Sequence, residues 1–224
     1  MTILDQFSLA GKTAIVTGGE GLMGKMICET IRELGGTALS VDIKGTADIC
    51  CDITVFSAVL KLAHIPVDIL VNNAVGNQKS VEGYSTGWEA DLQIGLTGAL
   101  NCIQILAPHL TANNGVILNM GSDLSLIGPD QSLYEKNFVK PVSYSVVKHG
   151  IVGLTRYFAT LWPNVRSNCL CPGGIDVGQK IPKVPIGRLA RLEELKAPVA
   201  FLISPASSYV TGTILSVDGG RTCL

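Results

Sequence analysis

The sequence predicts a single α/β domain in which a doubly wound parallel sheet is covered by helices on both faces, giving three layers. Short apolar runs alternate with longer segments of helical periodicity along the whole chain. Hydrophobic residues make up 47% of the 224 residues and charged residues only 16%, as expected for a sheet buried on both faces. No repeat or linker divides residues 1–224, which are therefore expected to form one domain.

The individual elements follow from apolar periodicity and from turn residues. Strands are expected at residues 13–17, 37–41, 48–53, 67–72, 115–120, 165–171 and 213–217, and helices at residues 22–34, 88–110, 142–161 and 192–203. Residues 43–51 are too few for a crossover helix of about a dozen residues. A loop or a single turn is therefore expected between the second and third strands.

Composition argues against several classes of partner. A net charge of −1 gives no basis for binding nucleic acid or an anionic membrane surface. No apolar run approaches the roughly 18 residues of a membrane span, and residues 1–12 lack the features of a signal peptide. The seven cysteines are scattered and have no zinc-ligand spacing. This pattern favours reduced thiols in a cytoplasmic protein.

A glycine-rich turn follows the first predicted strand and opens the first predicted helix. It contains Gly18, Gly19, Gly21, Leu22, Met23 and Gly24. Glycines permit positive φ angles and close backbone approach, and a helix N-terminus offers free N–H groups to a pyrophosphate. In this strand–turn–helix context the turn predicts a Rossmann-type site for a dinucleotide.

Asp42 stands at the end of the second predicted strand. A carboxylate there can accept hydrogen bonds from the adenosine ribose and would repel a 2′-phosphate, which favours NAD over NADP. Lys44 lies close by in the sequence and leaves NADP open. The alternative interpretation is an ordinary polar residue at a strand end.

Tyr144 and Lys148 are four residues apart, so on a helix they lie on the same face. An ammonium near a phenol stabilises the phenolate and is expected to lower the pKa of Tyr144. A hydroxyl such as Ser122 could hold a carbonyl or alcohol oxygen beside the phenol. The three groups would then form a proton-transfer centre for interconversion of an alcohol and a ketone. Alone, the Tyr/Lys pair is a weak signal, because such a pair more often lies on an exposed helix face.

Taken together, these motifs resemble the short-chain dehydrogenase/reductase family over nearly the whole chain. The resemblance implies that Tyr144 is the acid/base, that Lys148 lowers its pKa and binds the nicotinamide ribose, and that Ser122 orients the substrate oxygen. It further implies contacts to the dinucleotide from Asp52, Ile53, Asn73, Ala74, Pro172, Gly173 and Ile175. Asp52 could instead cap the next helix, and the two asparagines at 72–73 could brace the sheet.

Four departures from the family pattern are visible. Leu22 replaces a usual glycine, so that the glycine spacing resembles that of extended relatives. Gly95 stands where the family has an Asn that helps to hold a water. The segment 174–184 is too short for a helical lid, so the site is expected to be open on that side. The insertion 128–137 and the ending near Arg221 loosely resemble oxidoreductases of bacterial flagellin-glycan and nonulosonic-acid pathways, which suggests a sugar-type substrate.

The sequence therefore predicts an NAD(H)-dependent oxidoreductase that acts on a secondary alcohol or ketone of a small molecule, without a metal. The helices at 88–110 and 142–161 resemble those that pair across a two-fold axis in the family, so a homodimer or homotetramer is expected. Two alternatives stay open. One is a dinucleotide-binding protein of the same fold with little turnover, and the other is a dehydratase or epimerase that uses tightly held NAD.

Overall fold

The computed structural model describes residues 2–76, 87–134, 139–178 and 184–224. Within them, seven parallel strands form one sheet in the order β3-β2-β1-β4-β5-β6-β7. The strands are β1 (Thr13–Thr17), β2 (Thr37–Asp42), β3 (Ile49–Cys50), β4 (Ile69–Asn72), β5 (Val116–Met120), β6 (Arg166–Pro172) and β7 (Ile214–Val217). The predicted fold class is confirmed.

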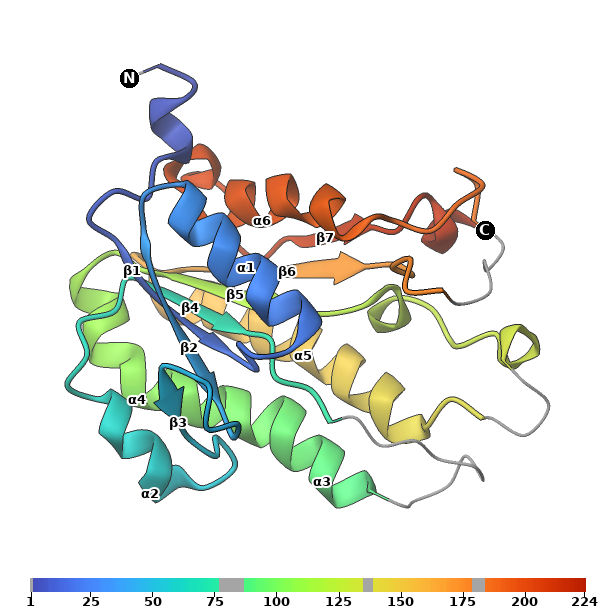
Figure 1. Cartoon of the computed structure of the whole chain (residues 1–224), viewed down its shortest axis with the longest axis horizontal. Helices are drawn as coiled ribbons and strands as arrows, with labels where there is room; N and C mark the ends of the chain where they lie inside the picture. Colours follow the sequence, from blue (N-terminus) through green and yellow to red (C-terminus); the bar gives the residue numbers. More distant parts are fainter. Residues whose placement is uncertain (1, 77–86, 135–138, 179–183) are drawn as a thin grey trace.

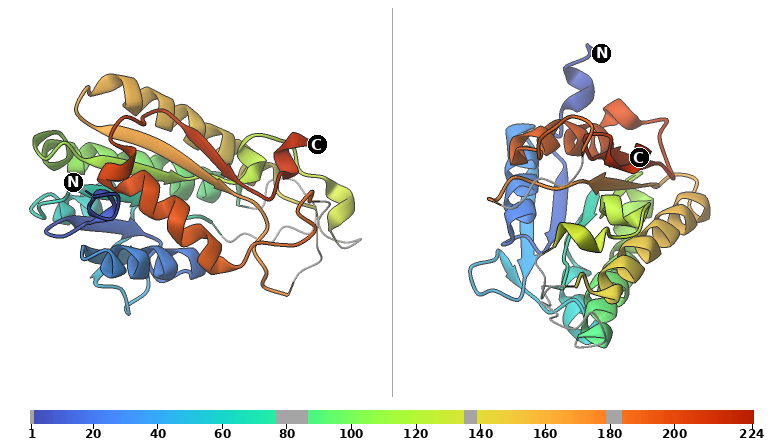
Figure 2. Two further views of the ribbon diagram at one scale, coloured as in Figure 1. Left: turned by 90° about the horizontal axis from the view of Figure 1, so that it is seen from above. Right: turned by 90° about the vertical axis from the view of Figure 1, so that its right-hand side faces the viewer.

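Helices cover both faces of this sheet (Figures 1 and 2). They are α1 (Leu22–Glu33), α2 (Phe56–Val59), α3 (Trp88–Leu92), α4 (Ala99–Ala112), α5 (Val142–Leu161) and α6 (Lys196–Ile203). Helices α1 and α6 pack on one face, and α2, α4 and α5 pack on the other. The alternation of side chains along β1 explains why both faces are covered. Ala14 and Val16 belong to the core under α1 and α6, and Ile15, between them, belongs to the core on the opposite face.

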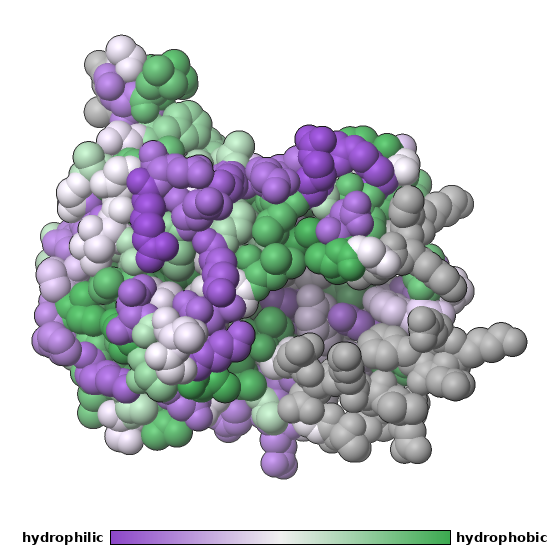
Figure 3. Space-filling view, in the orientation of Figure 1, coloured by the Kyte–Doolittle hydropathy of each residue, from purple (hydrophilic) through white to green (hydrophobic). Residues whose placement is uncertain are grey.

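The strand order places a crevice at one edge of the sheet. From β1 the chain winds outward through β2 to β3, then returns to β4 and winds the other way to β7. In open parallel sheets, ligands bind outside the carboxyl ends of the strands at such a switch point. Figure 3 shows the molecule hollowed on this side, beyond the ends of the strands.

Several predicted boundaries needed correction. The helix expected at 88–110 is α3 and α4 joined by a π-helical turn, Gln93–Gly98. Strand β3 is shorter than predicted because this edge strand pairs with β2 at only two positions, Val41↔Ile49 and Asp42↔Cys50. Helix α2 and the 3₁₀ turn Leu60–Leu62 that follows it were not predicted. The expected loop after β2 is confirmed, since residues 43–48 contain no helix.

Two features are not found among the described residues. In the part of the chain that the structure describes, no helix is long and apolar enough to cross a membrane. Among the same residues, no group of three or more His, Cys, Asp or Glu side chains could hold a metal ion. All seven cysteines are free thiols, five of them buried.

Candidate active site

A crevice of about 340 Å³ lies at the switch point between the two halves of the sheet. Five of the residues predicted to bind a dinucleotide line it, namely Gly18, Asp42, Asp52, Ile53 and Ala74. They come from the ends of β1 and β2 and from the segments after β3 and β4. Apolar side chains, including the exposed Ile43 and Val75, complete the lining. Such a space suits a flat apolar ring flanked by polar hydroxyls.

The glycine turn fits a phosphate ligand at Gly21. Gly18 has a φ of +63°, and a Cβ on it would lie 2.8 Å from the Cα of Ala74, so protein packing alone requires glycine there. A Cβ on Gly24 would overlap the carbonyl oxygen of Gly18. In contrast, a Cβ on Gly21 would meet only the Gly18 oxygen, at 3.3 Å. Gly21 is the N-cap of α1, where free N–H groups can receive an anion.

Asn73 braces this turn. Its side-chain amide donates to the carbonyl oxygens of Thr17 and Gly18, both at 3.0 Å. Its backbone N–H donates to Thr17 Oγ1 at 3.1 Å. Asn72 instead donates to Asn119 Oδ1 at 2.9 Å and so ties β4 to β5. The bracing role that the sequence left open is therefore present for both asparagines.

Asp42, at the end of β2, is linked to Glu20 of the glycine turn through a backbone hydrogen bond. Asp42 accepts hydrogen bonds from the backbone N–H groups of Glu20 at 3.1 Å and Lys44 at 3.2 Å. The Glu20 carboxylate accepts from Thr46 Oγ1 at 3.0 Å. Sequence reasoning missed Glu20, although its position inside the glycine turn could have identified it. Asp52 accepts hydrogen bonds from Thr54 N and Oγ1 at 2.9 and 2.7 Å, which makes a local turn. It does not cap the next helix, because the N-cap of α2 is Val55.

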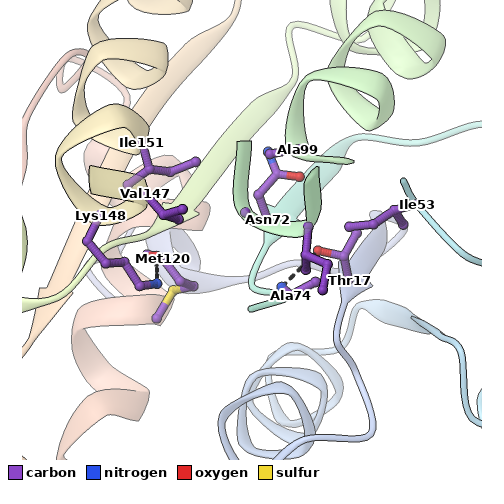
Figure 4. Close-up of a pocket in the computed structure, with 11 residues that line it drawn as sticks. Thr17, Ile53, Asn72, Ala74, Ala99, Met120, Val147, Lys148 and Ile151 are labelled. Carbon is purple, nitrogen blue, oxygen red and sulfur yellow. Dashed lines mark hydrogen bonds between the residues drawn. The ribbon is translucent and has the colours of Figure 1, made fainter. Parts of the chain in front are cut away.

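The three proton-transfer candidates converge between β5 and α5. Tyr144 and Lys148 lie on α5, and Ser122 follows β5 as the N-cap of the 3₁₀ turn Asp123–Ser125. The Ser122 hydroxyl lies close enough to the Tyr144 phenol to act on its pKa. Lys148 Nζ donates to the Met120 carbonyl at 2.7 Å and lies 5.7 Å from the Tyr144 ring centroid. A small pocket of about 10 Å³ separates Lys148 from Thr17, Asn72 and Ala74 across the sheet edge (Figure 4).

The electrostatics of this cluster differ from the sequence prediction. Burial raises the pKa of the Tyr144 phenol, and the neighbouring Ser122 hydroxyl only partly opposes this rise. The predicted lowering by Lys148 is absent because the ammonium is directed to the Met120 carbonyl and burial outweighs the other effects. Burial also lowers the pKa of Lys148 to about 8. Burial therefore shifts both groups toward their neutral forms, but the Lys148 ammonium is still the main form below a pH of about 8.

Asp123 and Arg221 form a buried ion pair beside Ser122 that the sequence analysis did not identify. Arg221 Nη1 lies 2.6 Å from Asp123 Oδ2, and their side chains are 11% and 5% exposed. The Ser122 hydroxyl donates to Asp123 Oδ1 at 2.8 Å. Arg221 comes from the 3₁₀ turn Arg221–Cys223, which follows β7. No sequence signal connects it to Asp123, because their contact depends on the order of β5, β6 and β7 in the sheet.

Lys140 is a second cation at the site. Its ammonium lies 3.8 Å from the ring centroid of Tyr144, a cation–π distance. Burial lowers the pKa of Lys140, while Asp123 and Asp91 act more weakly in the opposite direction. Among the described residues, no carboxylate forms a salt bridge with it. Lys140 precedes α5 by two residues and showed no motif in the sequence.

The segment after β6 closes the list of predicted contacts. Pro172 ends β6, and the Gly173 N–H donates to the Val217 carbonyl at 3.0 Å. Ile175 forms a parallel bridge with Ala190. Residues 174–178 contain no helix, and residues 179–183 lie outside the described part, so the expected open side is tested only in part. The insertion 128–137 forms the 3₁₀ turn Gln131–Leu133, and its residues 135–137 also lie outside.

Comparison with known proteins agrees with this geometry. The family model described as enoyl-(acyl carrier protein) reductase matches residues 3–222. The chain belongs to the short-chain dehydrogenase/reductase family. It is an oxidoreductase whose class interconverts alcohols and ketones with a nicotinamide dinucleotide.

Three relatives illustrate the range of the family. The 2-dehydro-3-deoxy-D-gluconate 5-dehydrogenase of Escherichia coli is 27% identical, with 97% of this chain and 98% of the relative covered. A structure of a short-chain dehydrogenase from Leptospira borgpetersenii with bound NAD⁺ has a TM-score of 0.87 and 28% identity. The match covers 99% of this chain and 96% of that one. A structure of a candidate NAD(P)-dependent gluconate 5-dehydrogenase from Beutenbergia cavernae, with bound NADP, has a TM-score of 0.83 and 28% identity. The match covers 98% of this chain and 100% of that one.

Proposed function

We propose that this protein is an NAD(H)-dependent dehydrogenase that oxidises a secondary alcohol of a sugar acid or reduces the corresponding keto acid. The observation that carries the proposal is the convergence of Ser122, Tyr144 and Lys148 between β5 and α5. The crevice that begins at the glycine turn lies across the sheet edge from them. Bound there, the dinucleotide would supply a hydride acceptor or donor for the substrate carbon.

Each side chain of the cluster has a distinct task. Tyr144 exchanges a proton with the substrate oxygen, which is general acid/base chemistry. Ser122, buried and fixed by its hydrogen bonds, orients that oxygen. Lys148 holds up to three donors at the base of the site, and one of them is bound to Met120 O in this structure. The remaining donors are available to a ribose hydroxyl and to the Tyr144 phenolate.

The preference for NAD over NADP rests on two carboxylates. A 2′-phosphate on the adenosine ribose would approach Asp42, and Glu20 lies against the same loop. Two like charges beside a phosphate oppose its binding more strongly than one. Two cations oppose this repulsion in part, since Lys25 lies 3.6 Å from Glu20 Oε2 and the Lys44 ammonium contacts the Glu20 backbone carbonyl at 3.4 Å. Asp42 forms no salt bridge among the described residues, so it carries most of the preference.

The substrate class rests on Lys140 together with the sugar-acid names of two relatives. A partly buried ammonium beside the acid/base, without a carboxylate partner among the described residues, favours an anionic ligand. A substrate carboxylate is such a ligand, and the polar turn beside Lys140, whose Gln131 Oε1 accepts from Lys140 N at 3.0 Å, suits a polyhydroxylated chain. The narrower resemblance to flagellin-glycan and nonulosonic-acid oxidoreductases stays a hypothesis within the same acidic class.

A matched substrate panel tests the proposal. The protein is assayed by NADH absorbance with sugar acids, with the corresponding neutral sugars, and with 3-oxoacyl thioesters. Lys140→Met should raise the KM for the acids by roughly 10-fold or more, the loss of a charge-assisted hydrogen bond, and leave neutral sugars unaffected. Lys12→Met is the control, because Lys12 pairs with Asp68 at the opposite edge of the sheet. Turnover of acyl thioesters only would refute the sugar-acid class.

The same assay separates the two alternatives. A dinucleotide-binding protein with little turnover would bind NADH yet produce no net change with any substrate. A dehydratase or epimerase would convert substrate to product without net NADH formation. Product analysis by mass spectrometry alongside the absorbance assay distinguishes these outcomes.

A further inference from the structure

The Ser122 side chain is held by groups from three directions. Its hydroxyl donates to Asp123 Oδ1 at 2.8 Å. Its oxygen accepts a hydrogen bond from the Leu124 N–H at 3.2 Å. The same N–H also donates to Asp123 Oδ1, at 2.8 Å. Its own backbone N–H donates to Ser125 Oγ at 3.0 Å. One lone pair of the hydroxyl is left for the Tyr144 phenol, so the rotamer of Ser122 depends on Asp123.

Asp123 can accept these hydrogen bonds because a cation balances its charge. Its Oδ1 is occupied by Ser122 and Leu124, and its Oδ2 by Arg221 at 2.6 Å. A buried carboxylate is stable only when it is paired and hydrogen-bonded. No other salt bridge to Asp123 exists among the described residues, so Arg221 is the group that keeps the carboxylate in place.

The titratable groups around Asp123 come from four segments. Arg221 faces it from the turn after β7, and Lys140 acts on it at longer range from the residues before α5. Tyr144 of α5 and Tyr134, after the turn Gln131–Leu133, both sense its charge. Of these four groups, Arg221 alone is in direct contact through a salt bridge, and the two phenols carry no charge at neutral pH.

We propose that Arg221 and Asp123 form a positioning pair that fixes the Ser122 hydroxyl for the substrate oxygen, so that the segment after β7 is part of the catalytic unit. The proposal rests on the proposed function, in which Ser122 contacts the substrate. Arg221 is a positioning residue, because it acts on the Ser122 hydroxyl only through Asp123.

The charge of the pair predicts a pH-dependent phenotype. Without Arg221, the buried Asp123 carboxylate takes up a proton more readily, because its charged form has lost its partner. A protonated Asp123 carries a hydrogen that needs its own acceptor, and the shared bonds to Ser122 and Leu124 must rearrange. The direction of the pH effect in the variant without Arg221 follows from this. Positioning of Ser122 is retained at high pH and lost as the pH falls.

The test compares four variants with the wild type over a range of pH. Arg221→Met should lower kcat by roughly 10- to 100-fold, the scale expected for a misplaced reacting group, and the loss should grow toward acid pH. Arg221→Lys should restore much of the activity and the wild-type pH profile. The double variant Asp123→Asn/Arg221→Met removes both charges and keeps a carbonyl acceptor for Ser122. Its kcat should lose the new pH dependence.

A matched control and two binding measurements separate positioning from stability. Arg188→Met breaks the more exposed pair between Arg188 and Glu194, also at 2.6 Å, and should leave kcat unchanged. The melting temperature and the affinity for NADH are measured for every variant. A wild-type kcat and pH profile in Arg221→Met would overturn the positioning role of the pair. The role would also be overturned if kcat fell among the variants only in proportion to their loss of melting temperature. Absence of turnover in the wild type would instead overturn the proposed function.

Discussion

Gly95 and Val147 occupy one space between the π-helical turn Gln93–Gly98 and α5. A Cβ on Gly95 would overlap Cγ1 of Val147, so only glycine fits opposite this valine. Both residues line the small pocket beside Lys148. The Asn that the family commonly has at this position therefore cannot be accommodated while Val147 is present. The pocket of about 10 Å³ leaves room for about one water.

The pair predicts a compensating double substitution. Gly95→Asn alone should destabilise the fold by about 1–3 kcal/mol, the range for overpacking a core, because the Cβ strikes Val147. Val147→Ala removes Cγ1, and the double variant Gly95→Asn/Val147→Ala should recover most of that loss. Urea unfolding at fixed pH measures each free energy of unfolding. Additive losses in the double variant would show that the two side chains do not compete for this space.

Tyr144→Phe should lower kcat by roughly 10²- to 10⁴-fold, the contribution of a general acid/base, because the variant has no phenolic proton to exchange. The affinity for NADH should stay the same, since the ring and its packing remain. Tyr209→Phe serves as the control, because Tyr209 is fully exposed. Initial rates and a fluorescence titration of NADH measure the two quantities. Wild-type rates in Tyr144→Phe would remove this residue from the mechanism.

Lys148 should reduce the stability of the fold at neutral pH. Burial lowers its pKa from 10.5 to about 8, so the folded state disfavours the ammonium that the unfolded chain keeps. Between pH about 8 and 10.5 the unfolded state binds more protons than the folded state. The contribution of Lys148 to the free energy of unfolding therefore rises through this window and is at its lowest below pH 8.

Lys148→Met should remove that rise, and it should stabilise the fold at pH 7. The comparison is the difference in unfolding free energy between wild type and variant from pH 7 to 10.5. Using the difference cancels the titration of tyrosines and other groups. A difference that stays constant across the window would contradict the lowered pKa.

The sequence predicted the sheet and the central site because both depend on local patterns. Strand ends carry Asp42, Asn72 and Ser122, and the Tyr144/Lys148 spacing needs only a helix. All of these were placed from periodicity and motif. The π-helical turn was missed, because the apolar spacing of 88–110 fits one helix. Two glycines of this turn lie close to residues distant in the sequence, Gly95 to Val147 and Gly98 to Ile53, and helical spacing carries no sign of these contacts.

The missed site residues share one property, which is that a partner distant in the sequence determines their role. Arg221 matters through Asp123, 98 residues away, and no motif links them. Lys140 is notable only because its ammonium meets the Tyr144 ring. The electrostatic error has the same origin. Helical spacing places Lys148 near Tyr144, but only the folded chain shows that its ammonium turns to Met120.

The cofactor preference should depend on Asp42 and Glu20 together. Asp42→Ala should tighten NADPH binding and weaken NADH binding, because it removes a repulsive charge and a ribose acceptor at once. Glu20→Gln should tighten NADPH binding with less effect on NADH, since it removes charge only. Titrations of NADH and NADPH against the wild type and the two variants give the ratio of the two dissociation constants for each protein. Tighter NADPH than NADH binding by the wild type would refute the preference.

An exposed apolar stripe on α5 predicts self-association. Val142, Val146, Tyr157 and Leu161 are 46%, 39%, 60% and 45% exposed and lie at helical spacing along one side of the helix. Gly153, between them, has no atom within 4 Å of its Cβ position, so a second helix could approach closely there. Such a stripe is typical of an interface.

The wild type should therefore be a dimer or larger by light scattering. Leu161→Glu should shift it toward monomer, because the interface would have to bury an unpaired carboxylate. Ile3→Glu is the control, since Ile3 is 66% exposed and lies on another segment. A monomeric wild type at micromolar concentration would refute the interface.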